Sequence, residues 1–225
     1  MARSRLVSVA AAGALALCAG AAIPGQALAS SHTGSGAAPR CAKRSSFKGG
    51  SGHRRRSCRH HVGGAHAHCP FTRLRPKPWN LERVRYAVLC LVNRERARHG
   101  ESALRPNRRL RRAAQAHTES MALGGYFGHD GPSGTPLSRM RAAGYISRAR
   151  GYEVGENIAF GTMWLATPRA IVSSWMRSPG HRANILDGRF RDTAIGVSTQ
   201  LARSLSHGQS GAIYTQDFGV VTRGR

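Results

Sequence analysis

The sequence predicts a layered α/β domain with an antiparallel sheet, preceded by a disordered basic tail. Apolar residues recur at helical spacing in several segments from residue 81 to 176. Two alternating apolar segments come last, at 195–197 and 212–220, and the polar loop 203–211 between them suits a hairpin-like pair. Helices that precede antiparallel strands favour helix layers packed on a sheet.

The N-terminus has the composition of a secretory signal peptide over residues 1–29. Arg3 and Arg5 precede an apolar run, 6–23, and Ala27-Leu28-Ala29 forms a small-residue cleavage site. The run is short and rich in Ala and Gly, which favours cleavage, and a retained membrane anchor is the alternative. We therefore expect a secreted protein that is extracellular or associated with the cell envelope.

Residues 30–68 form the predicted basic tail. They are rich in Ser, Gly, His and Arg, so they cannot bury enough apolar surface to offset the chain entropy of folding. Their His and Cys residues fit no regular zinc spacing, and we expect adventitious metal binding or none.

Charge is the main indication of a partner. The chain carries 35 Lys and Arg against 10 Asp and Glu, and a formal net charge of +25. In an exported chain this favours an anionic cell-wall polymer or a membrane surface, bound through the tail, and argues against nucleic acid. We treat the chain as a monomer.

Four cysteines remain after the leader: Cys41, Cys58, Cys69 and Cys90. An even number in an exported chain indicates disulfides, with three possible pairings. Cys90 lies just off the buried stripe of the first predicted helix, beside the expected path of the segment that carries Cys69. We therefore prefer Cys69–Cys90, which leaves Cys41–Cys58 to close a loop in the tail.

Two helices begin the folded domain, which we expect over residues 69–225. Asn80 is placed to cap the first, whose buried stripe should contain Leu81, Val84, Val88, Leu91 and Val92 and which should end at Gly100. Pro106-Asn107 should start the second, which Gly124-Gly125 ends. Its buried face should comprise Leu110, Ala114, His117 and Met121. We expect His117 to be a satisfied core histidine, with a ligand role as the alternative.

A short helix at 136–143 and a strand at 153–160 should follow. Val154, Glu156, Ile158 and Phe160 alternate onto one face of this strand. Glu156 is then a carboxylate among apolar neighbours. Because a buried charge needs a partner, Glu156 should be either functional or paired with an arginine.

A helix break lies within the stretch 175–186. Thr167-Pro168 should start the helix that carries Trp175, and Ser178-Pro179 should end it and start another, with the Ser178 hydroxyl as cap. His181 would be the third residue of the new helix. The positive end of the helix dipole favours a neutral imidazole there, which can ligate a metal or accept a proton. The alternative is a histidine that only packs.

Three groups could carry chemistry: His129, Glu156 and His181. No local spacing rule connects them. If the fold brings them together, two imidazoles and a carboxylate could hold zinc or another divalent metal with an open position, or transfer protons. The sequence has no Gly-x-Ser-x-Gly, His-Glu-x-x-His or phosphate-binding glycine motif.

Five motifs occur in one order along residues 80–221. They are LVNRERARHG at 91–100, YFGH at 126–129, GENIA at 155–159, the stretch 175–186 and YTQDFG at 214–219. Together they resemble the CAP superfamily of cysteine-rich secretory, antigen 5 and pathogenesis-related proteins, in its bacterial secreted branch. The resemblance covers the core of the domain and not the tail.

The resemblance implies a single three-layer α-β-α sandwich with a mainly antiparallel sheet and a histidine- and acid-lined cleft. His129, Glu156 and His181 would be three of the family's usual two histidines and two glutamates. The fourth position, a glutamate in eukaryotic relatives, is Ser178 here. The expected ligand-binding cleft comprises His129, Glu156, Asn157, Ser178, His181 and Asn184.

Three hypotheses on function follow. The first is a non-catalytic extracellular binding domain whose cleft takes a small ligand or divalent metal. The second is a metal-assisted hydrolase of peptide or cell-wall polymer, in which His129 and His181 are ligands and Glu156 is ligand or base. The third is a lipid-binding or protein-interaction module. The missing second acid, the absent nucleophile and the charge favour the first.

Overall fold

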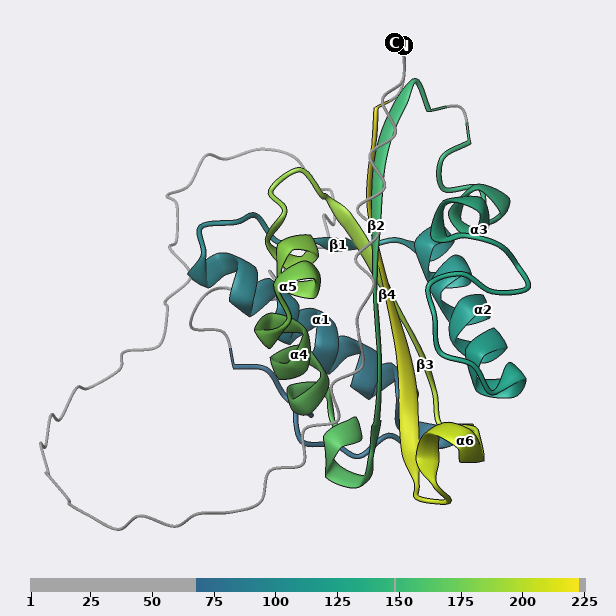
Figure 1. The fold of residues 1–225 in the computed structure, drawn as a ribbon. Coiled ribbons are helices and arrows are strands. Elements are labelled where there is room, and N and C mark those ends of the chain that lie inside the picture. The colour runs from purple at the N-terminus through teal and green to yellow at the C-terminus, as the bar shows by residue number, and fades with distance from the viewer. Residues whose placement is uncertain (1–67, 148, 223–225) are drawn as a thin grey trace, which may run out of the picture. The chain divides into compact units, whose positions relative to one another are not determined.

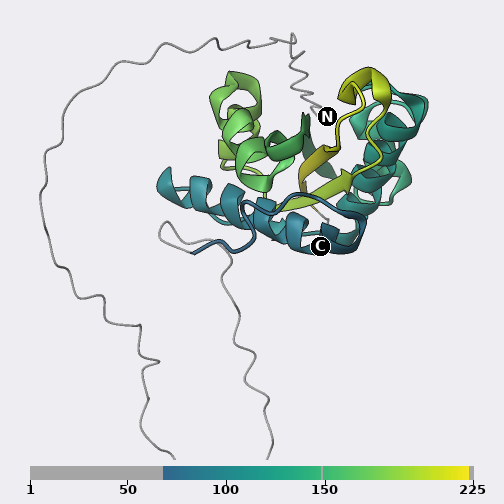
Figure 2. The ribbon, with the colours of Figure 1, turned by 90° about the horizontal axis from the view of Figure 1, so that it is seen from below.

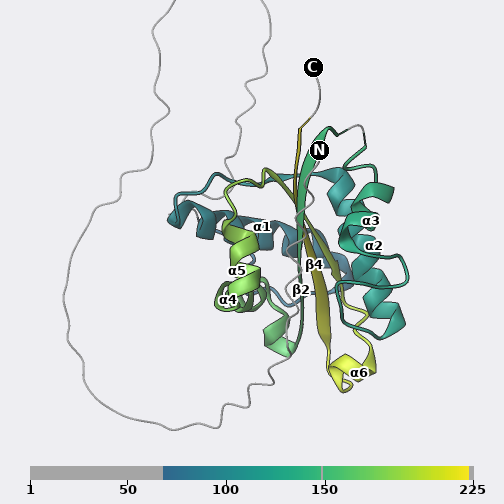
Figure 3. The ribbon, with the colours of Figure 1, turned by 45° about the horizontal axis from the view of Figure 1, so that its top comes forward.

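The fold is a three-layer sandwich in which one sheet lies between two sets of helices (Figure 1). The structure, a computed structural model, describes residues 68–147 and 149–222. The helices of one layer are α1 (Leu81–Arg98), α4 (Pro168–Arg177) and α5 (Pro179–Leu186), and those of the other are α2 (Arg108–Gly124) and α3 (Pro136–Ala142). Figure 2 and Figure 3 show the same separation from two other directions. The predicted fold class is confirmed.

The sheet has four strands in the order β1-β3-β4-β2. They are β1 (Arg105–Pro106), β2 (Gly151–Thr162), β3 (Asp192–Ser198) and β4 (Gly211–Thr222). β4 is central and antiparallel to both β2 and β3, whereas the short β1 is parallel to β3. The expectation of a mainly antiparallel sheet is therefore correct. The polar loop between β3 and β4 also contains a short helix, α6 (Arg203–Ser206).

Alternating side chains give each face of the sheet its own core. Trp175 of α4 and Tyr214 and Phe218 of β4 belong to the core beneath α1, α4 and α5. On the other face, Leu110 of α2 packs in one cluster with Val154 of β2, while other α2 and sheet residues, Met121, Ile158 and Ile213, form a second cluster. Even-numbered residues of β2 therefore face α2 and α3, and Glu156 shares that face with Val154 and Ile158.

The three predicted helix caps have different outcomes. Thr167 Oγ1 accepts from the N–H of Ala170, so this cap is confirmed. The Asn107 side chain accepts from the backbone N–H groups of Arg109 and Leu110, a cap that was not predicted at the expected start of α2. Asn80 and Ser178 lie at the expected boundaries, but neither side chain makes a capping hydrogen bond, and those two predictions are wrong.

The reasons differ between the two failed caps. The Asn80 amide is engaged with the preceding segment, because its oxygen accepts from Lys77 N and its nitrogen donates to the Arg75 carbonyl. At Ser178 the backbone N–H instead donates to the Ser174 and Trp175 carbonyls at the end of α4. The structure also contains two 3-10 turns. The turn η1 (Pro78–Asn80) precedes α1, and η2 (Met163–Ala166) follows β2.

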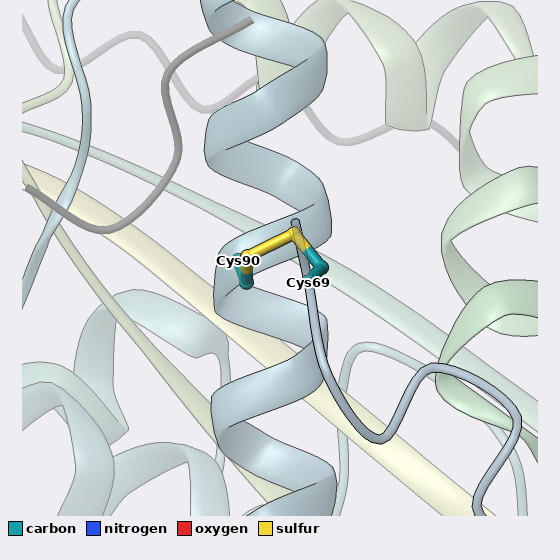
Figure 4. The surroundings of a disulfide bond; sticks show 2 residues. All are labelled: Cys69 and Cys90. Carbon is teal, nitrogen blue, oxygen red and sulfur yellow. A yellow bond between two sulfur atoms is a disulfide. The ribbon is translucent and has the colours of Figure 1, made fainter. Parts of the chain in front are cut away.

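The predicted disulfide Cys69–Cys90 is present and ties the lead-in segment to α1 (Figure 4). Cys41 and Cys58 lie outside the described residues, as do the predicted signal peptide, 1–29, and residues 30–67 of the predicted tail. Across 68–147 and 149–222, no helix combines the length and apolar character needed to cross a membrane.

A close approach of helix to sheet sets the position of α2. A Cβ atom at Gly196 of β3 would lie 2.4 Å from the Ala114 carbonyl oxygen and 2.5 Å from Thr118 Oγ1. Only glycine lets the backbone of α2 come so near. This contact fixes the helix that carries His117 directly over the sheet.

Candidate functional site

A buried pair of acids lies at the centre of the α2 face of the sheet. Glu156 of β2 and Asp217 of β4 are register partners in the antiparallel pair. Only 5% of Glu156 and 1% of Asp217 is exposed. Because two carboxylates this close and this buried cannot both carry charge cheaply, the pair requires a cation or a retained proton. The structure supplies both.

Arg139 is the cation. It comes from α3, and its Nη2 donates to Glu156 Oε2 at 2.6 Å while its Nη1 donates to the Gly134 carbonyl at 2.5 Å. Its side chain is as deeply buried as the carboxylate it meets. Of the two alternatives predicted for Glu156, the structure contains the arginine pairing.

His129 forms a hydrogen bond with the second carboxylate oxygen of Glu156. It lies on the loop between α2 and α3, and its Nδ1 is 2.9 Å from Glu156 Oε1. A carboxylate held by an arginine only accepts hydrogen bonds, so Nδ1 of His129 is the donor. Two of the three predicted site residues therefore meet, in a hydrogen bond.

His117 lies beside the same cluster. Its ring is fully buried on α2, Nε2 donates to the Gly128 carbonyl at 2.9 Å, and the same atom is 3.8 Å from Glu156 Oε1. Within the described part of the chain, Nδ1 has no hydrogen-bond partner. Burial lowers the pKa of His117, and the charge of Glu156 opposes this in part. The prediction of a core histidine is right as to burial, but its ring is not fully satisfied.

Asp217 is the carboxyl group that burial favours in its protonated form. Burial raises its pKa well above the ordinary value for an aspartate, the charge of Glu156 raises it further, and a hydrogen bond to Glu156 acts in the same direction. The sequence analysis missed Asp217. The alternation of side chains along β4 could have identified it. Gln216 and Phe218 lie on one face of the strand, so residue 217 lies on the opposite face, together with Glu156.

The two predicted cleft asparagines, Asn157 on the opposite face of β2 and Asn184 on α5, connect these two elements. Asn157 Nδ2 donates to the His181 carbonyl at 3.1 Å, and Asn184 Nδ2 donates to Asn157 Oδ1 at 2.9 Å and to the Glu156 carbonyl at 3.2 Å. Ser178 lies half-buried at the junction of α4 and α5. These contacts hold the start of α5 against β2.

His181 is the third residue of α5, as predicted. Burial lowers its pKa, and repulsion from His129 lowers it further, so the ring is neutral at pH 7. Its Nε2 is buried and has no hydrogen-bond partner among residues 68–147 and 149–222. β2 is an outer strand of the sheet, and His129 is near enough to His181 for its charge to act on that ring.

The donor set does not fit a resident zinc ion of the kind implied by the resemblance. Both oxygens of Glu156 are engaged, and Ser178 stands where a second acid would be needed. Among the described residues, no group of three or more His, Cys, Asp or Glu side chains is arranged to hold a metal. The hollows described in the structure lie around the N-terminal half of α2, and one of about 360 Å³ is lined by Arg85, Tyr86 and Arg111.

Comparison with known proteins identifies the class. A model of the cysteine-rich secretory protein family, CAP, matches residues 89–218. The chain belongs to this family. The matched region includes His129, Glu156, His181 and Asp217.

Two curated relatives come from Bacillus subtilis. The uncharacterized protein YkwD is 36% identical over 132 residues, which are 58% of this chain and 45% of YkwD. The uncharacterized membrane protein YlbC is 29% identical over 131 residues, 58% of this chain and 33% of YlbC. The chain thus spans less than half the length of the curated relatives it matches.

Two solved structures are similar in fold. An outer surface protein of Borrelia burgdorferi is 14% identical with a TM-score of 0.51, and the match covers 65% of this chain and 96% of that one. An extracellular protein of Bacillus anthracis that contains an SCP domain is 25% identical with a TM-score of 0.48, over 64% of this chain and 43% of that one.

Proposed function

We propose that the chain is a secreted, non-catalytic binding domain of the cell envelope. Its positive charge would hold it to anionic envelope material, and the rings of His129 and His181 would contact a small polar ligand. One observation carries the proposal: both carboxylate oxygens of Glu156 are engaged, one by Arg139 and one by His129.

This engagement argues against Glu156 as a general base or a metal ligand. A general base needs a free lone pair within reach of the proton it takes. Glu156 has neither a free oxygen nor access to solvent, and Asp217 is buried with its proton. The remaining groups of the predicted site are the imidazoles of His129 and His181, whose ring nitrogens suit hydrogen bonding to a ligand.

Location and charge support the binding role. The family is described as secretory, which agrees with the predicted signal peptide at 1–29. The described residues alone hold 22 Lys and Arg and all ten acidic residues, so the folded domain is itself basic without the predicted tail. Such a balance favours association with polyanions.

Metal content tests the proposal against the hydrolase alternative. The full chain is equilibrated with zinc, dialysed and analysed for bound metal, beside the variant His181→Ala. We expect well under one zinc per chain in both, and no release of fragments from casein or labelled peptidoglycan. About one zinc per chain, lost in the variant together with hydrolysis, would establish the hydrolase instead.

Envelope binding tests the electrostatic part. The protein is mixed with isolated cell envelopes and washed with rising NaCl. We expect release below about 0.5 M, where exposed charges more than a few ångströms apart are screened. Retention at the salt concentration of seawater contradicts this part of the proposal.

The ligand part is tested with a soluble muropeptide as probe. Side-chain NMR signals of His129 and His181 are expected to shift together during the titration, while those of buried His117 stay in place. Unchanged signals at millimolar muropeptide exclude wall-derived ligands of this size. Mass spectrometry of extracted lipid tests the third hypothesis, because a bound lipid would co-purify.

A further inference from the structure

We infer that one end of the domain docks directly on the surface of an anionic lipid bilayer. This apolar end consists of Trp79, Phe127, Phe160, Met163, Trp164 and Leu165. The inference goes beyond the proposed function, because it assigns a membrane contact to the folded domain itself and is independent of the tail and of the histidines.

Exposure of large apolar side chains sets this end apart. Trp79 is 82% exposed and Trp164 is 69% exposed, and the other four are each more than a third exposed. The third tryptophan of the chain, Trp175, is buried in the core. An exposed apolar cluster of this kind marks an interaction surface.

Contacts bring these residues together from separate segments. The rings of Phe127 and Phe160 meet edge to face with centroids 5.1 Å apart. Two residues after Phe160, at the end of β2, η2 begins, and it carries Met163, Trp164 and Leu165.

A second set of contacts joins the lead-in segment and the loop before β4 to η2. Met163 N donates to the Ser210 carbonyl at 2.7 Å, and Arg75 Nη2 is 3.4 Å from Met163 Sδ and 3.2 Å from Ser210 Oγ. The Asn80 side chain holds the Arg75 carbonyl, which keeps η1 and Trp79 near. The whole set lies where β2 ends and β4 begins, the lower end of the sandwich in Figure 1 and the near end in Figure 2.

The segments at this end are poor in acidic residues, and Asp130 follows directly on the segment that carries Phe127. Residues 68–80, 121–129, 159–170 and 199–211 carry no Asp or Glu, and they contribute Arg73, Arg75, Lys77, Arg169 and Arg203. Exposed tryptophans among arginines and lysines match the two layers of an anionic membrane surface, because indole rings prefer the headgroup level and basic side chains bind anionic headgroups. This charge complementarity favours a bilayer over a protein partner.

The turn that presents Trp164 is rigidly held. Thr167 Oγ1 donates to the Trp164 carbonyl at 2.8 Å, and the buried Tyr214 hydroxyl donates to the Ala166 carbonyl at 2.6 Å. A fixed turn loses little conformational entropy when its side chains enter the interface.

Tryptophan fluorescence of the full chain tests the inference, because two of the three tryptophans lie at this end and the third is buried. We expect vesicles of phosphatidylglycerol and phosphatidylcholine to shift the emission to shorter wavelength, and brominated lipid in those vesicles to quench it. Neutral phosphatidylcholine vesicles should do neither. Because these vesicles contain no wall polymer or muropeptide, the result is separate from the tests of the proposed function.

Variants assign the contact to named residues. Trp164→Ala is expected to weaken vesicle binding roughly tenfold and Arg75→Ala roughly fivefold. The matched controls, Tyr86→Ala and Arg112→Ala, remove an exposed aromatic and an exposed arginine elsewhere and should leave binding unchanged.

Three outcomes would overturn the inference. Vesicle pelleting without any change in tryptophan emission would assign binding to other parts of the chain. Equal binding to neutral vesicles would remove the role of charge. Concentration-dependent self-association that is lost in Trp79→Ala and Trp164→Ala would make this end an interface between copies of the chain.

Discussion

At the scale of single residues, one negative charge and one proton are shared within the Glu156 cluster. Arg139 and His129 hold the two oxygens of Glu156, and Asp217 keeps its proton beside them. The cluster is thereby close to neutral in a place where an unpaired charge would be costly. Its stability should depend on pH and on each partner.

Asp217 predicts a fall in stability with rising pH. Its pKa is raised in the folded state, so above about pH 4 the unfolded chain releases a proton that the folded chain keeps, and the free energy of unfolding falls as pH rises. Asp217→Asn should remove this slope between about pH 4 and pH 7 and leave the protein at least as stable at pH 7. Urea unfolding at several pH values measures it.

The control for this experiment is Asp130→Asn, which removes an exposed carboxylate. If Asp217→Asn keeps the slope of the original chain, the buried proton is not on Asp217.

Arg139 should be the costliest single loss in the cluster. Arg139→Gln leaves the Glu156 charge buried without its cation, and we expect a loss of about 3–5 kcal/mol in the free energy of unfolding. The double variant Arg139→Leu with Glu156→Leu should lose less than the single one, because it removes both charges. Arg141→Gln, an exposed arginine on the same helix, should change stability by less than about 0.5 kcal/mol.

At the scale of elements, the starts of α4 and α5 look alike in sequence and differ in structure. Each has a hydroxyl residue followed by proline. Thr167 accepts the Ala170 N–H, whereas the Ser178 hydroxyl makes no capping bond. Ser178 also ends α4, where its backbone N–H donates to the Ser174 and Trp175 carbonyls.

This difference gives a paired prediction. Thr167→Ala should lower the free energy of unfolding by about 1 kcal/mol, through loss of the cap and of the bond to the Trp164 carbonyl. Ser178→Ala should cost less than about 0.5 kcal/mol. Thermal or urea unfolding of the two variants compares them directly, and equal losses would contradict the observed capping pattern.

At the scale of the whole molecule, the excess of arginine opposes folding. The described residues carry 22 Lys and Arg and ten acidic residues, and compaction brings these like charges together. Moderate NaCl screens that repulsion. The same excess that suits the domain to anionic surfaces therefore makes it sensitive to ionic strength.

The midpoint of thermal unfolding should rise by a few degrees between about 10 mM and about 300 mM NaCl. Calorimetry at constant pH measures it. A midpoint that falls over this range would mean that the attractive pairs, such as Arg111 with Glu82, outweigh the repulsion.

The sequence predicted the elements better than the site. The stripe from Val84 to Val92 and the face of α2 follow from helical periodicity, which is a local property. Glu156 could be recognised because a carboxylate interrupts an apolar strand face. Its partner Arg139 could not be chosen among many arginines, because that depends on where α3 packs against β2.

The sequence by itself determined the α/β class and the pairing of Cys69 with Cys90. It also determined which elements carry His129, Glu156 and His181. These follow from periodicity, composition and ordered motifs, which are properties of the chain. Only the tertiary structure decided that Glu156 is neutralised by Arg139 and lies beside the proton of Asp217. The physical reason is register: the alignment of β2 with β4 and the packing of α3 place charges from distant segments together, and no local pattern encodes those distances.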